Sequence, residues 1–223
     1  MTELLFDKAV NNPERAPVML LSHGAGVGYD SPFMERLARA LAIHGVSVVR
    51  FEFPYMQRSR NDGRRRPPDR QPVLLEHFIE LVRWCRSEVG SDRLLVLAGK
   101  SMGGRMASLL AARPEMTEVH AVTCFGYPFH PPGKPDQWRT GHFGDIRVPM
   151  AIFQGTRDPF GKPEELDDQP SLPSRIELHW LEGGNHDLRP LKRQGLDPDA
   201  LIDESARLAA SFLHSLRPES VLL

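Results

Sequence analysis

The sequence predicts an α/β fold in which a mostly parallel sheet is covered by helices on both faces. Short apolar runs rich in Val, Ile, Leu and Phe recur along the chain, and helix-like patterns separate them. Parallel strands need such helical crossovers, and strands buried on both faces show little alternation of apolar and polar residues. A length of 223 residues fits one domain over 1–223 without a large lid.

Each expected element follows from a local pattern. Apolar runs with little alternation predict buried strands at 17–22, 46–53, 93–98, 121–125, 150–154 and 176–181, with a weaker antiparallel edge strand near 4–7. Apolar residues every three or four positions predict helices at 32–44, 71–89, 102–113 and 197–216, the last with an N-cap at Asp197. Two long loops, 54–72 and 128–149, are expected on the ligand side of the sheet.

Composition narrows the class of protein. Apolar residues make up 40% and charged residues 26%, and the formal net charge of −1 favours neither nucleic acid nor a membrane surface. No apolar run approaches the roughly 18 residues of a membrane span, and the first residues lack a secretion signal. Cys85 and Cys124 lack metal-ligand spacing, so we expect buried free thiols, a reducing cytoplasmic location and no metal. The oligomeric state is left open.

A candidate nucleophile lies between a predicted strand and a predicted helix. Residues 99–103 read Gly-Lys-Ser-Met-Gly, which matches the G-x-S-x-G pattern of a serine on a sharp strand-to-helix turn. Such a turn needs small residues on either side of the serine, and Gly99 and Gly103 meet that demand. The backbone N–H of Met102 would then favour a developing oxyanion at the helix N-terminus. The alternative is a tight turn around an unreactive Ser101.

A second oxyanion donor is expected in the loop after the first buried strand. Residues 23–26 read His-Gly-Ala-Gly, and an N–H of this loop completes the oxyanion hole in hydrolases of this pattern. We expect the N–H of Ala25, with that of Gly26 second, and a structural role for His23. A dinucleotide-binding reading of the glycines at 24, 26 and 28 fails, because Tyr29 stands where the third glycine is required.

The acid and the base follow in the order Ser, Asp, His. Asp158 comes shortly after the strand at 150–154, and His186 comes shortly after the strand at 176–181. Short loops at the carboxyl ends of these strands can direct both side chains towards Ser101. His186 would take the Ser101 proton, and Asp158 would orient and stabilise the imidazole. Less well placed alternatives for the acid are Asp187, Asp167 and Asp168, and the other histidines fit surface or packed positions.

Several of these segments together resemble a known family. They are residues 99–105, 125–134, 155–161 and 183–186. In combination they resemble small, lidless α/β-hydrolases akin to dienelactone hydrolase and to the testis-expressed and KANSL-type relatives, over roughly residues 15 to 215. The resemblance implies the α/β-hydrolase fold, a triad at Ser101, Asp158 and His186, and no cofactor. Dienelactone hydrolase proper uses a cysteine nucleophile, so its activity is not carried over to a chain with Ser101.

The leading hypothesis is a serine hydrolase acting on a small-molecule carboxylic ester or thioester. An interaction module with little turnover and an amide or peptide hydrolase are the alternatives. Loops after the strands suggest pocket residues, which are Tyr29, Arg64, Tyr127, Phe129 and His130. Six arginines between residues 55 and 70 could attract an anionic substrate, although a solvated flexible loop is the favoured explanation.

Overall fold

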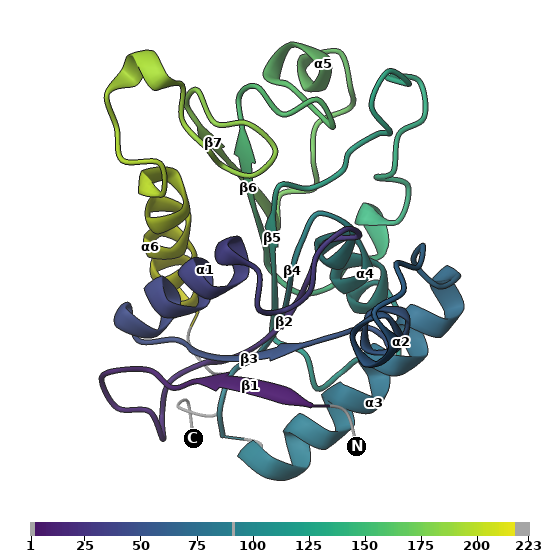
Figure 1. Ribbon diagram of the computed structural model, residues 1–223, viewed down its shortest axis with the longest axis vertical. Helices are drawn as coiled ribbons and strands as arrows, with labels where there is room; N and C mark the ends of the chain where they lie inside the picture. Colours follow the sequence, from purple (N-terminus) through teal and green to yellow (C-terminus); the bar gives the residue numbers. More distant parts are fainter. Residues whose placement is uncertain (1–2, 91, 217–223) are drawn as a thin grey trace.

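The computed structural model describes residues 3–90 and 92–216 and has a layered α/β architecture (Figure 1). Its strands form one seven-stranded sheet in the order β1-β3-β2-β4-β5-β6-β7. Neighbouring strands run parallel, except that β1 pairs antiparallel with β3. The strands are β1 (Leu4–Asp7), β2 (Val18–Ser22), β3 (Ser47–Phe51), β4 (Leu95–Lys100), β5 (Ala121–Phe125), β6 (Met150–Gly155) and β7 (Ile176–Leu181). The predicted mostly parallel α/β fold is therefore confirmed.

Helices cover both faces of the sheet (Figure 1). One face packs against α1 and α6, and the other packs against α3 and α4. The helices are α1 (Pro32–Ile43), α2 (Pro54–Asp62), α3 (Gln71–Val89), α4 (Met102–Ala111), α5 (Pro163–Asp167) and α6 (Ala200–Ser215), with short 3₁₀ turns at η1 (Phe143–Asp145) and η2 (Lys192–Gln194).

The core explains why the central strands show little alternation. In β4, Leu97 packs into the cluster under α3 and α4, whereas its neighbours Val96 and Ala98 pack into the cluster under α1 and α6. All six residues of β4 are buried. Successive strand side chains point to opposite faces, so a strand covered on both faces is apolar over most of its length.

The arginine-rich segment at 54–72 was expected to be a loop, and this prediction was wrong in part. Its first half forms α2, which starts with Pro54 at the first helical position and ends before Gly63 at φ 70°. Tyr55 is the one buried residue of this helix, so the sequence carries no apolar stripe that would have indicated it.

Other boundaries shift slightly. The strand expected at 93–98 extends to Lys100, where its register with Phe125 of β5 carries it up to the serine turn. The last helix starts at Ala200 rather than at 197, because Asp197 forms a preceding turn in which its side chain accepts a 2.8 Å hydrogen bond from the N–H of Asp199. The short helix α5 and the 3₁₀ turns were not expected.

Both cysteines are buried free thiols, as predicted. Burial raises the pKa of the Cys85 thiol to about 11, which leaves it inert at neutral pH. Over residues 3–90 and 92–216, no helix combines the length and apolar character needed to cross a bilayer.

Candidate active site

Ser101 stands at the sharp turn between β4 and α4. Its backbone has φ 53° and ψ −115°, a left-handed conformation that is rare for a residue with a side chain. The turn is tight: a Cβ on Gly99 would lie 2.2 Å from the backbone of Gly103, and one on Gly103 would lie 2.7 Å from the carbonyl oxygen of His23. Glycine at both positions is therefore what permits the strained serine.

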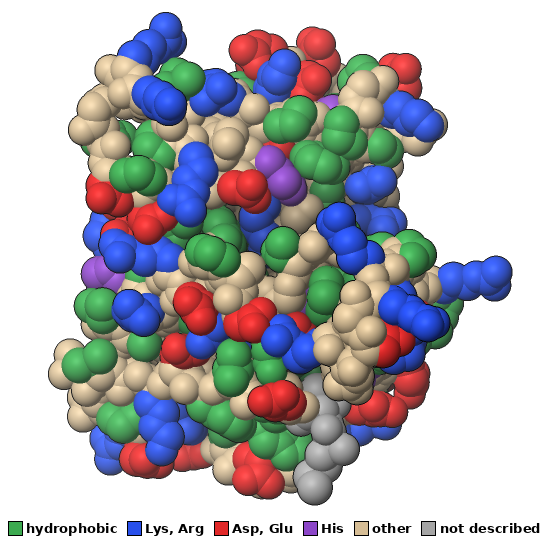
Figure 2. Space-filling model, viewed as in Figure 1, with side chains coloured by type: hydrophobic (Ala, Val, Ile, Leu, Met, Phe, Trp, Pro, Cys, Tyr) green, Lys and Arg blue, Asp and Glu red, His purple; other side chains and the backbone are tan. Residues whose placement is uncertain are grey.

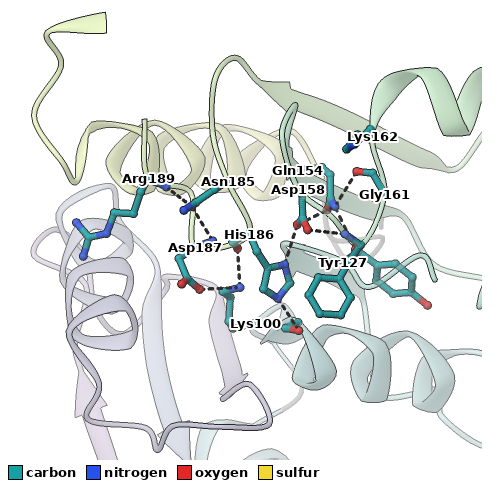
Figure 3. A network of polar contacts seen from close by, with 12 residues as sticks. Lys100, Tyr127, Gln154, Asp158, Gly161, Lys162, Asn185, His186, Asp187 and Arg189 are labelled. Atoms are coloured by element: carbon teal, nitrogen blue, oxygen red, sulfur yellow. Dashed lines mark hydrogen bonds and ion pairs between the residues drawn. The ribbon is translucent and has the colours of Figure 1, made fainter. Parts of the chain in front are cut away.

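A hydrogen-bonded chain joins Ser101, His186 and Asp158. The Ser101 Oγ lies 2.9 Å from His186 Nε2, and His186 Nδ1 donates to Asp158 Oδ2 over 2.8 Å (Figure 3). The three residues come from the ends of three parallel strands, β4, β6 and β7, which meet at one edge of the sheet. The structure thus brings together the three side chains that the sequence analysis selected.

Asp158 is fully buried and fixed from several sides. Its Oδ1 accepts a 2.9 Å bond from the N–H of Phe160, and its Oδ2 accepts a 3.0 Å bond from Gln154 Nε2 in addition to the His186 bond. The Phe160 ring also lies against the imidazole, with 4.3 Å between the ring centroids. These contacts leave the carboxylate and the imidazole little freedom to move apart.

Lys100 connects the nucleophile turn to the loop of His186 (Figure 3). Its side chain is buried, and its ammonium donates a 2.6 Å hydrogen bond to the His186 carbonyl oxygen and lies 3.3 Å from Asp187 Oδ1. Burial lowers the pKa of the ammonium, and the carboxylate of Asp187 opposes that effect. Asp187, one alternative for the acid, therefore pairs with Lys100 while Asp158 holds the imidazole.

The loop at 23–26 lies against the nucleophile turn. A Cβ on Gly24 would be 3.8 Å from the Ser101 Cβ. The Tyr55 hydroxyl donates to the carbonyl oxygen of Ala25 over 2.9 Å, which restrains this exposed residue of the loop. Met102 is the first residue of α4, where a backbone N–H has no partner within the helix. The N–H groups of Met102 and of Ala25 or Gly26 remain the candidate oxyanion donors.

His23 is a buried residue that connects two loops. Its Nε2 accepts a 3.1 Å bond from the N–H of Phe53, and its Nδ1 donates to the carbonyl oxygen of Gly24. Burial lowers the pKa of this imidazole and favours its neutral form. These contacts agree with the structural role expected for it.

In the described part of the chain, the side chains of the other predicted pocket residues make no hydrogen bond to Ser101, His186 or Asp158. Tyr127 and Phe129 are fully buried in the core cluster under α3 and α4, and His130 is buried against Glu165 of α5. Tyr29 is buried beneath the Arg60 guanidinium, and Arg64 is exposed on the segment after α2. Phe129 lines a cavity that is separate from these three residues, whereas Tyr29, Tyr127 and His130 pack the loops onto the sheet.

Three of the six arginines between residues 55 and 70 form ion pairs with carboxylates. Arg58 pairs with Asp69, Arg60 with both Asp30 and Glu52, and Arg66 with Asp62. Figure 2 shows basic and acidic side chains interspersed on the part of the surface over α2. This segment therefore offers less free positive charge than its sequence suggests.

Sequence reasoning missed Lys100, Gln154 and Phe160. All three lie close in sequence to a residue that was selected. Lys100 is the first variable position of the G-x-S-x-G pattern, and Gln154 and Phe160 lie within four residues of Asp158. A lysine inside a strand that is otherwise apolar was the available signal, because such a charge needs a partner. For Gln154 and Phe160 the sequence carried no signal of their contacts.

Two further features bear on ligands. In the described ranges, His, Cys, Asp and Glu side chains form no group of three or more that could hold a metal ion.

A cavity of about 520 Å³ lies between β7 and the loops around it, lined in part by Phe129, Trp138, Leu166 and Trp180. None of its lining residues belongs to the chain of Ser101, His186 and Asp158.

A parallel sheet with a serine on a strained strand-to-helix turn, next to a histidine and a buried aspartate, defines the α/β-hydrolase class. The chain belongs to this family: residues 15–214 match the family model described as "Alpha/beta hydrolase domain".

Solved structures agree on the fold. Dienelactone hydrolase from Anabaena variabilis is 22% identical, with a TM-score of 0.72 over 97% of this chain and 93% of that one. Est1E from Butyrivibrio proteoclasticus is 15% identical, with a TM-score of 0.71 over 96% and 95% of the two chains. XC6422 from Xanthomonas campestris, a serine hydrolase without a lid, is 18% identical, with a TM-score of 0.64 over 97% and 90%.

Proposed function

We propose that this hydrolase cleaves a carboxylic ester or thioester through an acyl-enzyme on Ser101. The observation that carries the proposal is the unbroken chain of hydrogen bonds from Ser101 through His186 to Asp158, with distances of 2.9 and 2.8 Å. Both lie within the reach that proton transfer requires. Because Asp158 accepts from Nδ1, the free lone pair of His186 is on Nε2, the atom that faces the serine hydroxyl.

The reaction would proceed in two halves. Ser101 Oγ attacks the carbonyl carbon while its proton passes to His186 Nε2, and the imidazolium then protonates the departing alcohol or thiol as the acyl–oxygen or acyl–sulfur bond breaks. A water molecule next loses a proton to His186 and attacks the acyl-enzyme. Collapse of that intermediate releases the carboxylic acid and returns the proton to Ser101. Throughout, the buried carboxylate of Asp158 stabilises the imidazolium.

The tetrahedral intermediates place a negative charge on the former carbonyl oxygen. The N–H of Met102 and an N–H of the 23–26 loop, that of Ala25 or Gly26, are the donors we assign to it. Removing one such donor typically costs about 10²–10³ in kcat, so this part of the site carries much of the rate enhancement.

The choice of an ester or thioester as substrate rests on the chemistry of the leaving group and on the similar solved structures. Alcohols and thiols leave more readily than amines, so the unassisted triad suits these substrates best. The similar solved structures include a dienelactone hydrolase and Est1E with ferulic acid bound. The proposal also includes a closer relation to the testis-expressed and KANSL-type hydrolases. It further includes a cytoplasmic location, which the two free thiols support.

The test is a pair of measurements on the protein and its Ser101→Ala variant. We expect the unsubstituted protein to hydrolyse p-nitrophenyl acetate and to be labelled by a fluorophosphonate probe, and we expect the variant to do neither. Retention of full activity in Ser101→Ala would remove this serine from the mechanism. A folded, unlabelled protein without turnover would instead favour the interaction module, and turnover confined to amide substrates would favour the amidase.

A further inference from the structure

Among the described residues, Arg105 and Arg139 have no carboxylate partner, unlike three arginines of the arginine-rich segment. Arg105 belongs to α4, and its N–H donates to the carbonyl oxygen of Ser101 over 3.1 Å, so it stands one helical turn from the nucleophile. Arg139 belongs to the long loop that follows β5. Within the described residues, neither side chain enters an ion pair, whereas Arg58, Arg60 and Arg66 all do.

Two hydroxyl groups link the backbones at Arg105 and Arg139. The Ser108 hydroxyl donates to the carbonyl oxygen of Arg105 over 2.9 Å and lies 3.5 Å from the Tyr127 hydroxyl. That hydroxyl in turn donates to the carbonyl oxygen of Arg139 over 3.0 Å. The backbones of α4 and of the loop are thus joined through the buried side chains of Ser108 and Tyr127.

Both guanidinium groups are partly withdrawn from water. The Arg105 Nε is buried and has no hydrogen-bond partner among the described residues, which is a costly state for a charged group. Burial lowers the pKa of Arg139, and the positive charge of Arg105 lowers it further. An uncompensated pair of like charges in a partly buried site is typical of a place where an anion binds.

The neighbouring ionisable groups do not remove this charge. His142, bonded to Ser108 over 2.8 Å, has a pKa lowered to about 4 by burial and by Arg105, so it is neutral at physiological pH. The carboxylate of Asp145 lies near enough to raise that pKa slightly, but among the described residues it forms no ion pair with either arginine. At neutral pH the two guanidinium groups therefore remain unneutralised.

We infer that Arg105 and Arg139 bind an anionic oxygen group, a carboxylate or a phosphate, carried by the substrate. Side chains on an α-helix lean towards its N-terminus, so Arg105 leans towards the turn that carries Ser101. The loop with Arg139 leaves the carboxyl end of β5, the strand beside β4. This inference rests on the proposed function, since it names the substrate class of the same site: an ester or thioester with a negative group remote from the reacting carbonyl.

The kinetic test compares mono-p-nitrophenyl succinate, which carries a carboxylate, with neutral p-nitrophenyl butyrate. In Arg105→Met and in Arg139→Met, we expect the ratio of kcat/KM for the anionic ester to that for the neutral ester to fall about tenfold or more. Arg65→Met, which removes an exposed arginine from the segment after α2, should leave the ratio unchanged. An equal ratio in all variants, or a fall in Arg65→Met alone, would overturn the inference.

A binding test separates this inference from the proposed function. Calorimetry on Ser101→Ala protein, with monomethyl succinate in one arm and methyl phosphate in the other, requires no turnover. We expect at least one of the two anions to bind, and its affinity to drop about tenfold or more when Arg105→Met or Arg139→Met is added. An affinity that is unchanged in both arginine variants, or the absence of binding for both anions, contradicts the anion site at Arg105 and Arg139 even if the esterase reaction is established. Binding that depends on them, without ester turnover, contradicts the proposed reaction instead.

Discussion

The ammonium of Lys100 donates a hydrogen bond to the carbonyl oxygen of His186, although 86 positions separate them in the chain. Lys100 directly precedes the nucleophile, so the contact ties the turn that carries Ser101 to the loop that carries the base. The same ammonium pairs with Asp187, the residue after His186. The relative position of nucleophile and base thus depends on a buried charge as well as on their own hydrogen bond.

Replacing Lys100 by methionine keeps a side chain of similar length and removes the ammonium. We expect kcat for p-nitrophenyl acetate to fall about tenfold or more with KM nearly unchanged, because a hydrogen bond to a charged group contributes about 1.5–3 kcal/mol. The rate of fluorophosphonate labelling should fall in parallel. Lys192→Met, at an exposed lysine, is the matched control. An Lys100→Met protein with a lower Tm but an undiminished labelling rate would limit Lys100 to a structural role.

Asp158→Asn tests the buried acid. An asparagine fits the space but has no negative charge, so it can neither stabilise an imidazolium nor fix the tautomer that leaves His186 Nε2 free to accept a proton. We expect kcat to fall by a factor on the order of 10³–10⁴, as such changes do in serine hydrolases. Asp187→Asn, which alters the partner of Lys100, should cost far less. Equal losses in the two variants would mean that Asp158 acts through structure alone.

Gly99→Ala tests the close approach at the turn. The added methyl group would lie 2.2 Å from the backbone of Gly103 and 2.4 Å from the Ser22 Oγ, so the turn must shift. Such overpacking costs about 1–3 kcal/mol, or roughly 3–10 °C in Tm for a domain of this size. We expect esterase activity to fall as Ser101 is displaced. Gly141→Ala, where a Cβ meets nothing within 4 Å, should change neither quantity.

The position of the site could be predicted because its parts follow local rules. Ser101 comes between a strand and a helix with glycines on either side, and Asp158 and His186 each follow a buried strand. Parallel strands present their carboxyl ends at one edge, so three segments distant in sequence were expected to converge there. The structure confirms the fold and brings these side chains within hydrogen-bonding distance.

The remaining features depend on contacts that no local pattern encodes. The helix α2 buries Tyr55 alone, so it has no periodicity to detect. Arg60 appeared to be free charge because its partners, Asp30 and Glu52, lie in other segments. Conversely, Arg105 and Arg139 carried no sequence signal, since what distinguishes them is that their partly buried side chains form no hydrogen bond or ion pair among the described residues.

His142 leads to a prediction for stability against pH. Its imidazole is partly buried beside Arg105, and its pKa is lowered to about 4 from an ordinary value near 6.5. Between these two values the unfolded chain binds a proton at this position and the folded protein does not. The free energy of unfolding therefore decreases as the pH falls through this window, with a slope of at most roughly 1.4 kcal/mol per pH unit from this residue, reduced by solvent screening.

His142→Gln removes the titrating group while keeping a side chain that can bond to Ser108. We expect guanidinium chloride unfolding at pH 7 and at pH 5 to show a smaller loss of stability on acidification in the variant than in the unsubstituted protein. Other groups titrate alike in both proteins, including the buried His23, so the difference between the two pH slopes isolates His142. Parallel slopes would mean that this imidazole is protonated in the folded state. In that case its charge would stand beside Arg105 and Arg139 at pH 5 and would strengthen anion binding there, which the calorimetric comparison detects.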